Sequence, residues 1–411
     1  MKTIVILGGG VGGIVTANKL RRLMPSENNI IVIEKDRIHS FAPSFLWLMT
    51  GKRRKDQISR DISLLISKNI DIRNEEVISI NPEEKFVETG KEKIYFDFLV
   101  IALGAELYPE AIPGLSSNSL DYYSFDGAQK LHDVLQKFDS GKIAVVVASL
   151  PYKCPAAPYE GAMLISDFFK RKGIRQKIDI DLFTPEPAPM PVAGPALGEA
   201  VKQVLGTRKI NYYPLHKLIS VEPDHKELQF EGKSPISYDL LVVIPPHRSP
   251  KVIQSSKLAG QSGWIPVDQS TLQTNFESVF AIGDVTSITI PGRWKPDVSM
   301  ILPKAGIFAH LQAEVVAQRI ADKLKGKKSE SQFCGEGFCM LEAGEDVAGF
   351  AYGNFYGEPA PDVKLRKTGT TWHWGKILFE KWWLAPLGLK KTLTRTALNF
   401  GAKILRIPVR V

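Results

Sequence analysis

The stretch Gly8–Gly13, with the sequence GGGVGG, decides the fold. It follows a short apolar run, Lys2–Leu7, and precedes a helical pattern that continues through Leu23. A second apolar run, Asn29–Glu34, comes next, so the chain opens with a strand, a helix and a second strand. A G-x-G-x-x-G motif in that position is typical of dinucleotide-binding α/β proteins, and a glycine-rich turn in another α/β protein is the alternative.

The glycines and one acid of this unit have separate physical roles. Gly8 allows the tight turn, Gly10 lets a pyrophosphate approach the backbone, and Gly13 lets the helix and strand pack closely. Glu34 ends the second strand, where a carboxylate can accept hydrogen bonds from a ribose diol and disfavours a 2′-phosphate. The unit therefore predicts a dinucleotide site at the helix N-terminus.

Composition limits the class of protein. The chain has 411 residues, of which 44% are apolar and 24% charged, which suits a globular protein of two or three domains. Three cysteines do not make a disulfide framework. The first apolar run starts too close to Met1 for a secretory signal, and no apolar run is long enough to span a bilayer. We therefore expect the cytoplasm as the compartment.

Further apolar runs predict a parallel α/β fold. The expected buried strands are Phe98–Leu103, Ile143–Ala148, Leu240–Ile244 and Ser278–Ile282. A long helix is expected from near Lys304 through Ile320. We predict two Rossmann-like domains, the first of them discontinuous, and a C-terminal α+β region. Their expected extents are 1–105 with 246–325, then 106–245, then 326–411.

The second strand–helix turn lacks the glycines of the first. The stretch Ser149–Glu160 follows a predicted strand and contains three prolines and Cys154, with no glycine before Gly161. Proline has no N–H group and fixes the backbone, so this turn cannot hold a pyrophosphate in the usual way. We interpret it as a lost nicotinamide site with a cysteine in its place.

Several separated motifs carry a resemblance to a known family. They are Phe98–Gly104, Lys153–Pro155, Pro245–Arg248 (PPHR) and Ala281–Asp284 (AIGD). With the first glycine motif they make the chain resemble two-dinucleotide-binding-domain flavoproteins, and among these sulfide:quinone oxidoreductases and the flavoprotein subunit of flavocytochrome c sulfide dehydrogenase. The resemblance covers nearly the whole chain. It implies FAD, with no NAD(P) and no metal. The flavin should be non-covalent, because Ser40–Phe45 contains no cysteine.

The resemblance also implies a set of cofactor contacts. Asp284 would hold the ribityl chain, and Pro303–Gly306 would open a helix whose positive end faces the flavin pyrimidine edge. A turn or N-cap role is the alternative for Asp284. The full expected set is Gly8, Gly10, Gly13, Glu34, Lys35, Pro43, Ala102, Gly104, Gly283, Asp284, Lys304, Ala305 and Gly306.

The catalytic residues come from the same resemblance. Cys154 and Cys339 would form a redox pair beside the flavin, with two unrelated buried thiols as the alternative. Glu160 is a candidate proton carrier, and a helix-start carboxylate is its alternative. The expected quinone contacts are Phe338, Lys304 and Phe379, although Phe379 could equally be a core or lipid-facing aromatic. Neither the persulfide-bearing cysteine nor a role for Cys334 is decided.

The tail is basic and aromatic. From Lys364 to Val411 there are eleven Lys and Arg residues and one acid, within a chain of net charge +9. Lys376–Ala385 is helix-like and rich in tryptophan. After Pro386, one helical face carries Leu389, Leu393, Ala397, Phe400 and Ile404. This pattern is typical of a helix lying in a membrane surface. A helix docked on the body and a nucleic-acid-binding tail are the alternatives, and the tail tryptophans favour lipid.

The sequence therefore predicts a sulfide:quinone oxidoreductase at the cytoplasmic face of the cell membrane, a peripheral enzyme that passes electrons from sulfide to a membrane quinone. A type II NADH:quinone oxidoreductase and a sulfide dehydrogenase subunit that reduces a cytochrome are the rival functions. We expect no nucleic-acid partner, and homo-oligomerisation is left open.

Overall fold

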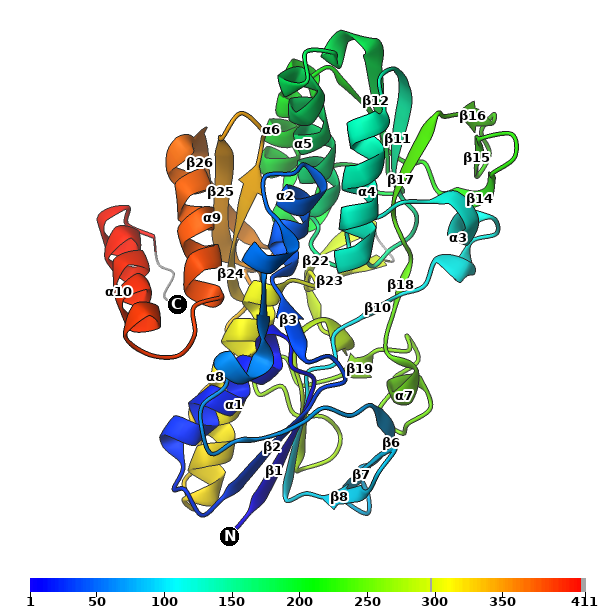
Figure 1. Ribbon diagram of the computed structural model, residues 1–411. Helices are drawn as coiled ribbons and strands as arrows, with labels where there is room; N and C mark the ends of the chain where they lie inside the picture. The colour runs from blue at the N-terminus through cyan, green and yellow to red at the C-terminus, as the bar shows by residue number, and fades with distance from the viewer. Residues whose placement is uncertain (296–297, 408–411) are drawn as a thin grey trace.

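The first sheet carries the glycine motif. A computed structural model describes residues 1–295 and 298–407. Five parallel strands lie in the order β20-β9-β1-β2-β5, and their bounds are Val279–Ala281, Phe98–Ile101, Thr3–Leu7, Asn29–Ile33 and Asp71–Arg73. Helices α1 (Val11–Leu23) and α8 (Gly306–Leu324) pack together beside this sheet (Figure 1). Segments from both halves of the chain therefore share one sheet.

The second sheet is also parallel. Its order is β13-β12-β11-β17, with bounds Ile210–Tyr213, Ile178–Phe183, Gly141–Val147 and Leu240–Ile244. Helices α4 (Phe125–Lys137), α5 (Ala157–Arg171) and α6 (Pro195–Thr207) accompany it. Its central strand is fully buried from Ile143 to Val147, because a parallel sheet is covered on both faces. The two sheets match the predicted pair of Rossmann-like units.

Short elements surround the two sheets. Paired strands are β3 (Ile38–Ser40) with β4 (Ser59–Asp61), β10 (Glu106–Leu107) with β18 (His247–Arg248), β19 (Ile265–Pro266) with β21 (Thr286–Ser287), and β22 (Thr289–Lys295) with β23 (Val298–Ile301). Three-stranded sheets join β6–β8 (Val77–Asn81, Phe86–Thr89, Lys93–Tyr95) and β14–β16 (Leu218–Glu222, Glu227–Phe230, Ile236–Ser237). Short helices are α2 (Phe45–Met49), α3 (Leu115–Asn118) and α7 (Lys251–Gln254).

The C-terminal region is an antiparallel sheet followed by two helices. Strands β24, β25 and β26 span Glu336–Glu342, Ala348–Asn354 and Asp362–Gly369. Helix α9 (Thr370–Trp383) packs on this sheet, and α10 (Leu389–Ile404) lies on the outside of the molecule (Figure 1). Helix α9 begins at Thr370, six residues before the predicted start at Lys376, so residues 370–375 also belong to it.

The tail tryptophans do not form the aromatic membrane edge that the sequence predicted. Trp382 and Trp383 are buried in the core of the first unit, and Trp372 stacks on Phe350 at a ring distance of 4.6 Å. The Trp383 indole N–H donates to His39 Nε2 at 2.9 Å. Of the four tail tryptophans, only Trp374 is exposed. That part of the prediction is wrong, because Trp382 and Trp383 pack into the core of the first unit, where Trp383 also finds a hydrogen-bond partner.

Helix α10 presents its apolar face to solvent. Leu389, Leu393, Phe400 and Ile404 are 76%, 60%, 65% and 63% exposed. Leu398, on the opposite side of the helix, packs against the body. Such a helix has an unpartnered apolar stripe with basic flanks. In the described part of the chain, none of the helices has the length and hydropathy to cross a membrane.

Candidate functional site

The first glycine motif has the geometry of a dinucleotide turn. Gly8 has φ of +100°, a left-handed conformation in which a side chain would also lie 2.5 Å from the carbonyl oxygen of Ala102. A Cβ on Gly13 would lie 1.8 Å from the carbonyl oxygen of Gly8. Gly10 faces open space, with no atom within 4 Å of an added Cβ. The three glycines therefore have the predicted geometry: Gly8 makes a tight turn, Gly13 allows the close contact of helix and strand, and Gly10 leaves room for a ligand.

Acidic groups flank this turn on two sides. Glu34 accepts hydrogen bonds from the N–H groups of Gly9 at 2.5 Å and Asp36 at 2.9 Å. Asp284 follows β20, and its buried Oδ1 has no hydrogen-bond partner among the described residues. Burial raises the pKa of Asp284, and the charges of Lys153 and Lys304 act against that rise. An unpaired buried carboxylate oxygen fits the hydroxyl groups of a ribityl chain, so these residues fit FAD.

Other predicted cofactor residues lie around the same turn. Gly283 and Gly104 have φ of +73° and +69°, and Gly306 begins α8 facing Val11. Lys35 and Pro43 are exposed. The remaining two positions, Ala102 and Ala305, are half-buried and pack against the first core.

Lys304 connects the loop that follows β20, at Asp284 and Thr286, to the wall of a cavity. Its Nζ donates to the carbonyl oxygens of Asp284 at 2.7 Å and Thr286 at 2.9 Å, and it lies 3.5 Å from the ring centre of Trp264. Burial lowers the pKa of Lys304 to about 8. The ammonium is therefore committed to two carbonyls and a ring rather than free to meet a ligand.

The proline-rich turn holds Cys154 in a fixed place. Cys154 has φ of +53°, a left-handed conformation that is costly for a residue with a side chain. Its N–H donates to the carbonyl oxygen of Lys304 at 2.7 Å, and Lys153 and Lys304 form a parallel bridge. The backbone of the second unit is thus joined at Cys154 itself to the segment that carries Lys304. This N–H group is used within the protein, where a nucleotide turn would leave it for phosphate.

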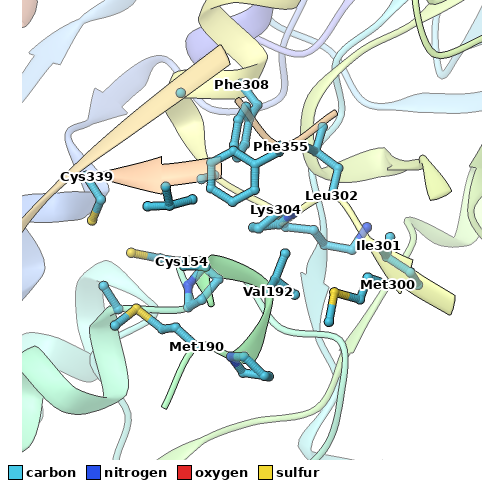
Figure 2. Close-up of a pocket in the computed structure, with 18 of the residues that line it drawn as sticks. Cys154, Met190, Val192, Met300, Ile301, Leu302, Lys304, Phe308, Cys339 and Phe355 are labelled. Carbon is cyan, nitrogen blue, oxygen red and sulfur yellow. The ribbon is translucent and has the colours of Figure 1, made fainter. Parts of the chain in front are cut away.

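Both predicted cysteines line one chamber. Cys339 lies on β24, and a chamber of about 370 Å³ is bordered by Cys154 and Cys339. Figure 2 shows both sulfur atoms turned toward the same end of this chamber. Both residues are free thiols. Cys334, by contrast, is exposed and lies outside the chamber lining.

Buried charges surround the cysteine pair. Glu160, in the first turn of α5, accepts hydrogen bonds from Lys376 Nζ at 2.5 Å and from the N–H of Glu342 at 2.8 Å. Burial, with the charge of Glu160, raises the pKa of Cys154 to about 12 and raises that of Cys339 as well, while Lys376 acts in the opposite direction. The thiols are therefore kept protonated unless a proton acceptor takes part.

Sequence reasoning missed several members of this cluster. Burial alone would lower the pKa of Lys376, but Glu160 and Glu342 raise it above its usual value. Glu342 also lies 2.9 Å from Nδ1 of His373. Glu186, another buried carboxylate, lines the chamber. A lysine or histidine on an amphipathic helix gives no signal of burial, because its partners are distant in sequence.

The predicted quinone residues form an aromatic contact. The rings of Phe338 and Phe379 meet edge to face at 6.0 Å, and Phe379 also contacts Phe41 at 6.1 Å and Trp382 at 5.3 Å. Phe338 lines the chamber, whereas Phe379 is half-buried outside its lining. The aromatic pair therefore lies between the sulfur-bearing strand and α9. Among the described residues, no cluster of three His, Cys, Asp or Glu could hold a metal ion.

The fold and the glycine motif define a class of protein. Residues 2–306 match the pyridine nucleotide-disulphide oxidoreductase family, so the chain belongs to that family and is a flavin-dependent oxidoreductase. Within it, the chain is 31% identical to the mitochondrial sulfide:quinone oxidoreductase of Dictyostelium discoideum over 69% of this chain and 65% of that one. The mouse mitochondrial enzyme is also 31% identical, over 69% and 66%.

A bacterial relative matches along nearly its whole length. The sulfide-quinone reductase of Aquifex aeolicus is 29% identical over all of this chain and 96% of its own. The crystal structure of that organism's sulfide:quinone oxidoreductase superposes with a TM-score of 0.86 at 27% identity, covering 100% of this chain and 96% of that one. The predicted fold class and family are confirmed. The two mitochondrial relatives are longer, and the chain spans just under two thirds of each.

Proposed function

We propose that this flavin-dependent oxidoreductase oxidises sulfide through Cys154 and Cys339 and reduces a membrane quinone. The observation that carries the proposal is the shared chamber of the two cysteines, one of which replaces the glycine turn of a nicotinamide site. The similarity to sulfide:quinone oxidoreductases supports it. FAD, held by the first glycine turn, Glu34 and Asp284, would take up two electrons from the cysteine pair and release them to quinone.

The cysteines carry the sulfur chemistry. The structure has Cys154 and Cys339 as free thiols, and in the oxidised enzyme they would be joined by an S–S bond. Hydrosulfide attacks one sulfur of this bond, the bond breaks, a persulfide forms on one cysteine, and the other cysteine leaves as a thiolate. Lys376 supplies the positive charge that favours this thiolate, since its charge lowers the pKa of both thiols. Glu160, joined to Lys376, accepts the proton that remains on the persulfide when the two electrons are passed on.

The quinone would bind at the aromatic pair. Phe338 and Phe379 offer two ring surfaces beside the strand that carries Cys339. Lys304 suits a quinone carbonyl less well than the sequence suggested, because its ammonium already donates to two backbone carbonyls. Peripheral binding of α10 to the membrane surface would bring this site near the lipid-soluble substrate.

Two features make NADH an unsuitable electron donor. Pro151, Pro155 and Pro158 have no N–H groups to offer a pyrophosphate. The N–H of Cys154 is bonded to Lys304. NADH should therefore leave the flavin oxidised.

The test is anaerobic flavin absorbance. Sulfide should bleach the flavin of the parent and of Cys334→Ser within seconds, and NADH should not. In Cys154→Ser and Cys339→Ser, sulfide should reduce the flavin at least about 10³-fold more slowly, while dithionite still reduces it. Parental speed in the double variant, or rapid bleaching by NADH, would contradict the proposal.

A further inference from the structure

A second buried carboxylate faces the chamber from the side of the second sheet. Glu186 comes three residues after β12 ends, is 5% exposed, and lines the same chamber as Cys154 and Cys339. In the first unit, Glu34 directly follows the second strand, whereas Glu186 lies two residues further along its own loop. Each unit therefore has a carboxylate in the loop after its second strand, although the prolines of the second unit's first turn do not suit a nucleotide.

The contacts of Glu186 leave one oxygen available. Oε2 accepts hydrogen bonds from the hydroxyls of Tyr152 at 2.8 Å, Tyr159 at 2.9 Å and Thr184 at 3.3 Å. In the described part of the chain, no hydrogen bond ends on Oε1, and this oxygen is not fully enclosed by protein. Tyr152 lines the chamber too. The carboxylate is thus oriented by three hydroxyls, with its second oxygen free for a molecule in the chamber.

The surroundings of Glu186 place its titration near neutrality. Burial raises the pKa of Glu186 to about 7, and the three hydroxyls act against that rise. The titratable groups that interact with it are the tyrosines at 123, 152, 159 and 212. The pKa of each of these tyrosines is raised, so all four are neutral near pH 7. The carboxyl can therefore alternate between its two forms at working pH, which suits a general base.

The chamber favours a neutral substrate. The side chains that line it are mainly apolar or sulfur-bearing, such as Met190, Val192, Met300 and Phe308 (Figure 2). Leu150, Ser299 and Ile301 line it and are also exposed, so the chamber reaches solvent there. Moving an anion into apolar surroundings is costly, so hydrogen sulfide enters more readily than hydrosulfide. The neutral form must then lose a proton before it can attack sulfur.

We propose that Glu186 is the base that deprotonates hydrogen sulfide inside the chamber. The inference rests on the proposed sulfide oxidation and adds a catalytic residue to it. Glu186 takes one proton from H₂S, and the hydrosulfide attacks one sulfur of the bridged cysteines. The S–S bond breaks, its electron pair leaves on the other cysteine, and the proton on Glu186 passes to water at the chamber mouth.

Glu160 does not perform this step. Its Oε1 is occupied by Lys376 and by the N–H of Glu342, and it does not line the chamber. Glu160 accepts the proton of the persulfide, and Glu186 accepts the first proton of the incoming hydrogen sulfide. The two carboxylates therefore divide the two proton transfers of one sulfide oxidation.

The experiment compares Glu186→Gln with Asp181→Asn in the flavin-loaded protein. Asp181 is a buried carboxylate on the same β12, bonded to Asn211, and lies outside the chamber lining. Stopped-flow flavin reduction by sulfide is followed from pH 5.5 to 8.5. Glu186→Gln should lower the limiting rate about 100-fold at pH 7 and remove the limb that rises through pH 7. Asp181→Asn should keep the parental limiting rate and the limb that rises through pH 7.

Further measurements distinguish a failure of the role of Glu186 from a failure of the proposed sulfide oxidation. Tyr152→Phe keeps the carboxylate but removes a bond that favours its charged form, so the rising limb should move to higher pH. An unmoved limb, a parental profile in Glu186→Gln, or NADH reduction that depends on Glu186 would overturn the role of Glu186. If sulfide reduces neither parent nor variants while dithionite does, the proposed function itself fails.

Discussion

The ammonium of Lys376 lies 2.5 Å from Oε1 of Glu160, and both side chains are buried. The pair joins α9 of the C-terminal region to the start of α5, across 216 residues of sequence. Because Glu160 also accepts the N–H of Glu342 on the cysteine-bearing strand, one carboxylate holds together the elements that carry the two thiols. The C-terminal region is therefore part of the proposed catalytic centre as well as the carrier of the exposed helix.

Replacing Lys376 with methionine should destabilise the protein by about 3–5 kcal/mol, because it leaves the Glu160 carboxylate buried and unpaired. Denaturant unfolding of the flavin-loaded protein measures the change. Sulfide-dependent flavin reduction should also slow, since Lys376 lowers the pKa of both thiols.

The matched control is Lys381→Met on the same helix, because that lysine is half exposed and its partner Glu380 keeps its bond to Arg53. It should cost less than about 1 kcal/mol. Adding Glu160→Gln to Lys376→Met should recover much of the lost stability. Equal effects of the two lysine variants would show that burial of the pair has no energetic consequence.

Two substitutions in the glycine turn should affect different properties, one the folding of the protein and the other its affinity for FAD. Gly13→Ala should prevent stable folding, because its Cβ would lie 1.8 Å from the carbonyl oxygen of Gly8. Gly10→Ala meets open space at an ordinary φ of −75°, so the protein should fold but bind FAD at least about tenfold more weakly. Thermal unfolding and fluorescence titration of flavin distinguish these outcomes. Unchanged FAD affinity in Gly10→Ala would place the pyrophosphate elsewhere.

The sequence predicted what depends on local pattern and missed what depends on distant partners. The turn at Gly8–Gly13 and the strands could be predicted, because glycine spacing and apolar runs act within a few residues. Cys154 and Cys339 could be paired only by family resemblance, since no local rule joins residues so far apart. Lys376 begins a stretch that the sequence marks only as helix-like, and its burial depends on Glu160, which is distant in sequence.

Two other misses have different causes. The tail tryptophans resembled a membrane edge, but Trp383 finds its hydrogen-bond partner on His39, which no pattern near it could indicate. Glu186 had only a weak signal, since it lies three residues past the second strand of its unit, whereas Glu34 follows its strand directly. The prolines of the turn at Ser149–Glu160 argue against nucleotide binding in this unit, and they do not indicate what else Glu186 could do.

Alkylation should distinguish the exposed Cys334 from Cys154, which lines the chamber. In the reduced protein at pH 8, iodoacetamide should modify exposed Cys334 first, and Cys154 at least about 100-fold more slowly. Burial raises the pKa of Cys154 to about 12, so its labelling rate should rise about tenfold per pH unit between pH 8 and 10. Peptide mass spectrometry follows each site. Labelling of Cys154 as fast as Cys334 at pH 8 would mean that its thiolate is already populated.

Membrane binding should depend on the exposed face of α10. Replacing Leu393 and Phe400 by aspartate should weaken binding to anionic lipid vesicles at least about 100-fold, since each side chain contributes about 1.5–3 kcal/mol when buried. Aspartates at Ile78 and Ile219 are the matched control, because these are exposed isoleucines on β6 and β14, away from α10 (Figure 1). An equal loss of vesicle binding in both double variants would mean that the added negative charge, and not the apolar face of α10, causes the loss.

Glu186 should make the stability of the protein depend on pH without any substrate. Its carboxyl has a folded pKa of about 7 against an ordinary value of 4.5, so the unfolded chain releases the proton first as pH rises. The stability associated with the neutral form is present below about pH 4.5 and is lost as pH rises to 7, by about 3 kcal/mol. Glutamine cannot ionise, so the unfolding free energy of Glu186→Gln relative to the parent should increase between pH 5 and 8 by up to that amount. Urea unfolding at a series of pH values gives this difference directly, and a difference that stays constant would mean that Glu186 is already charged at pH 5 in the folded protein.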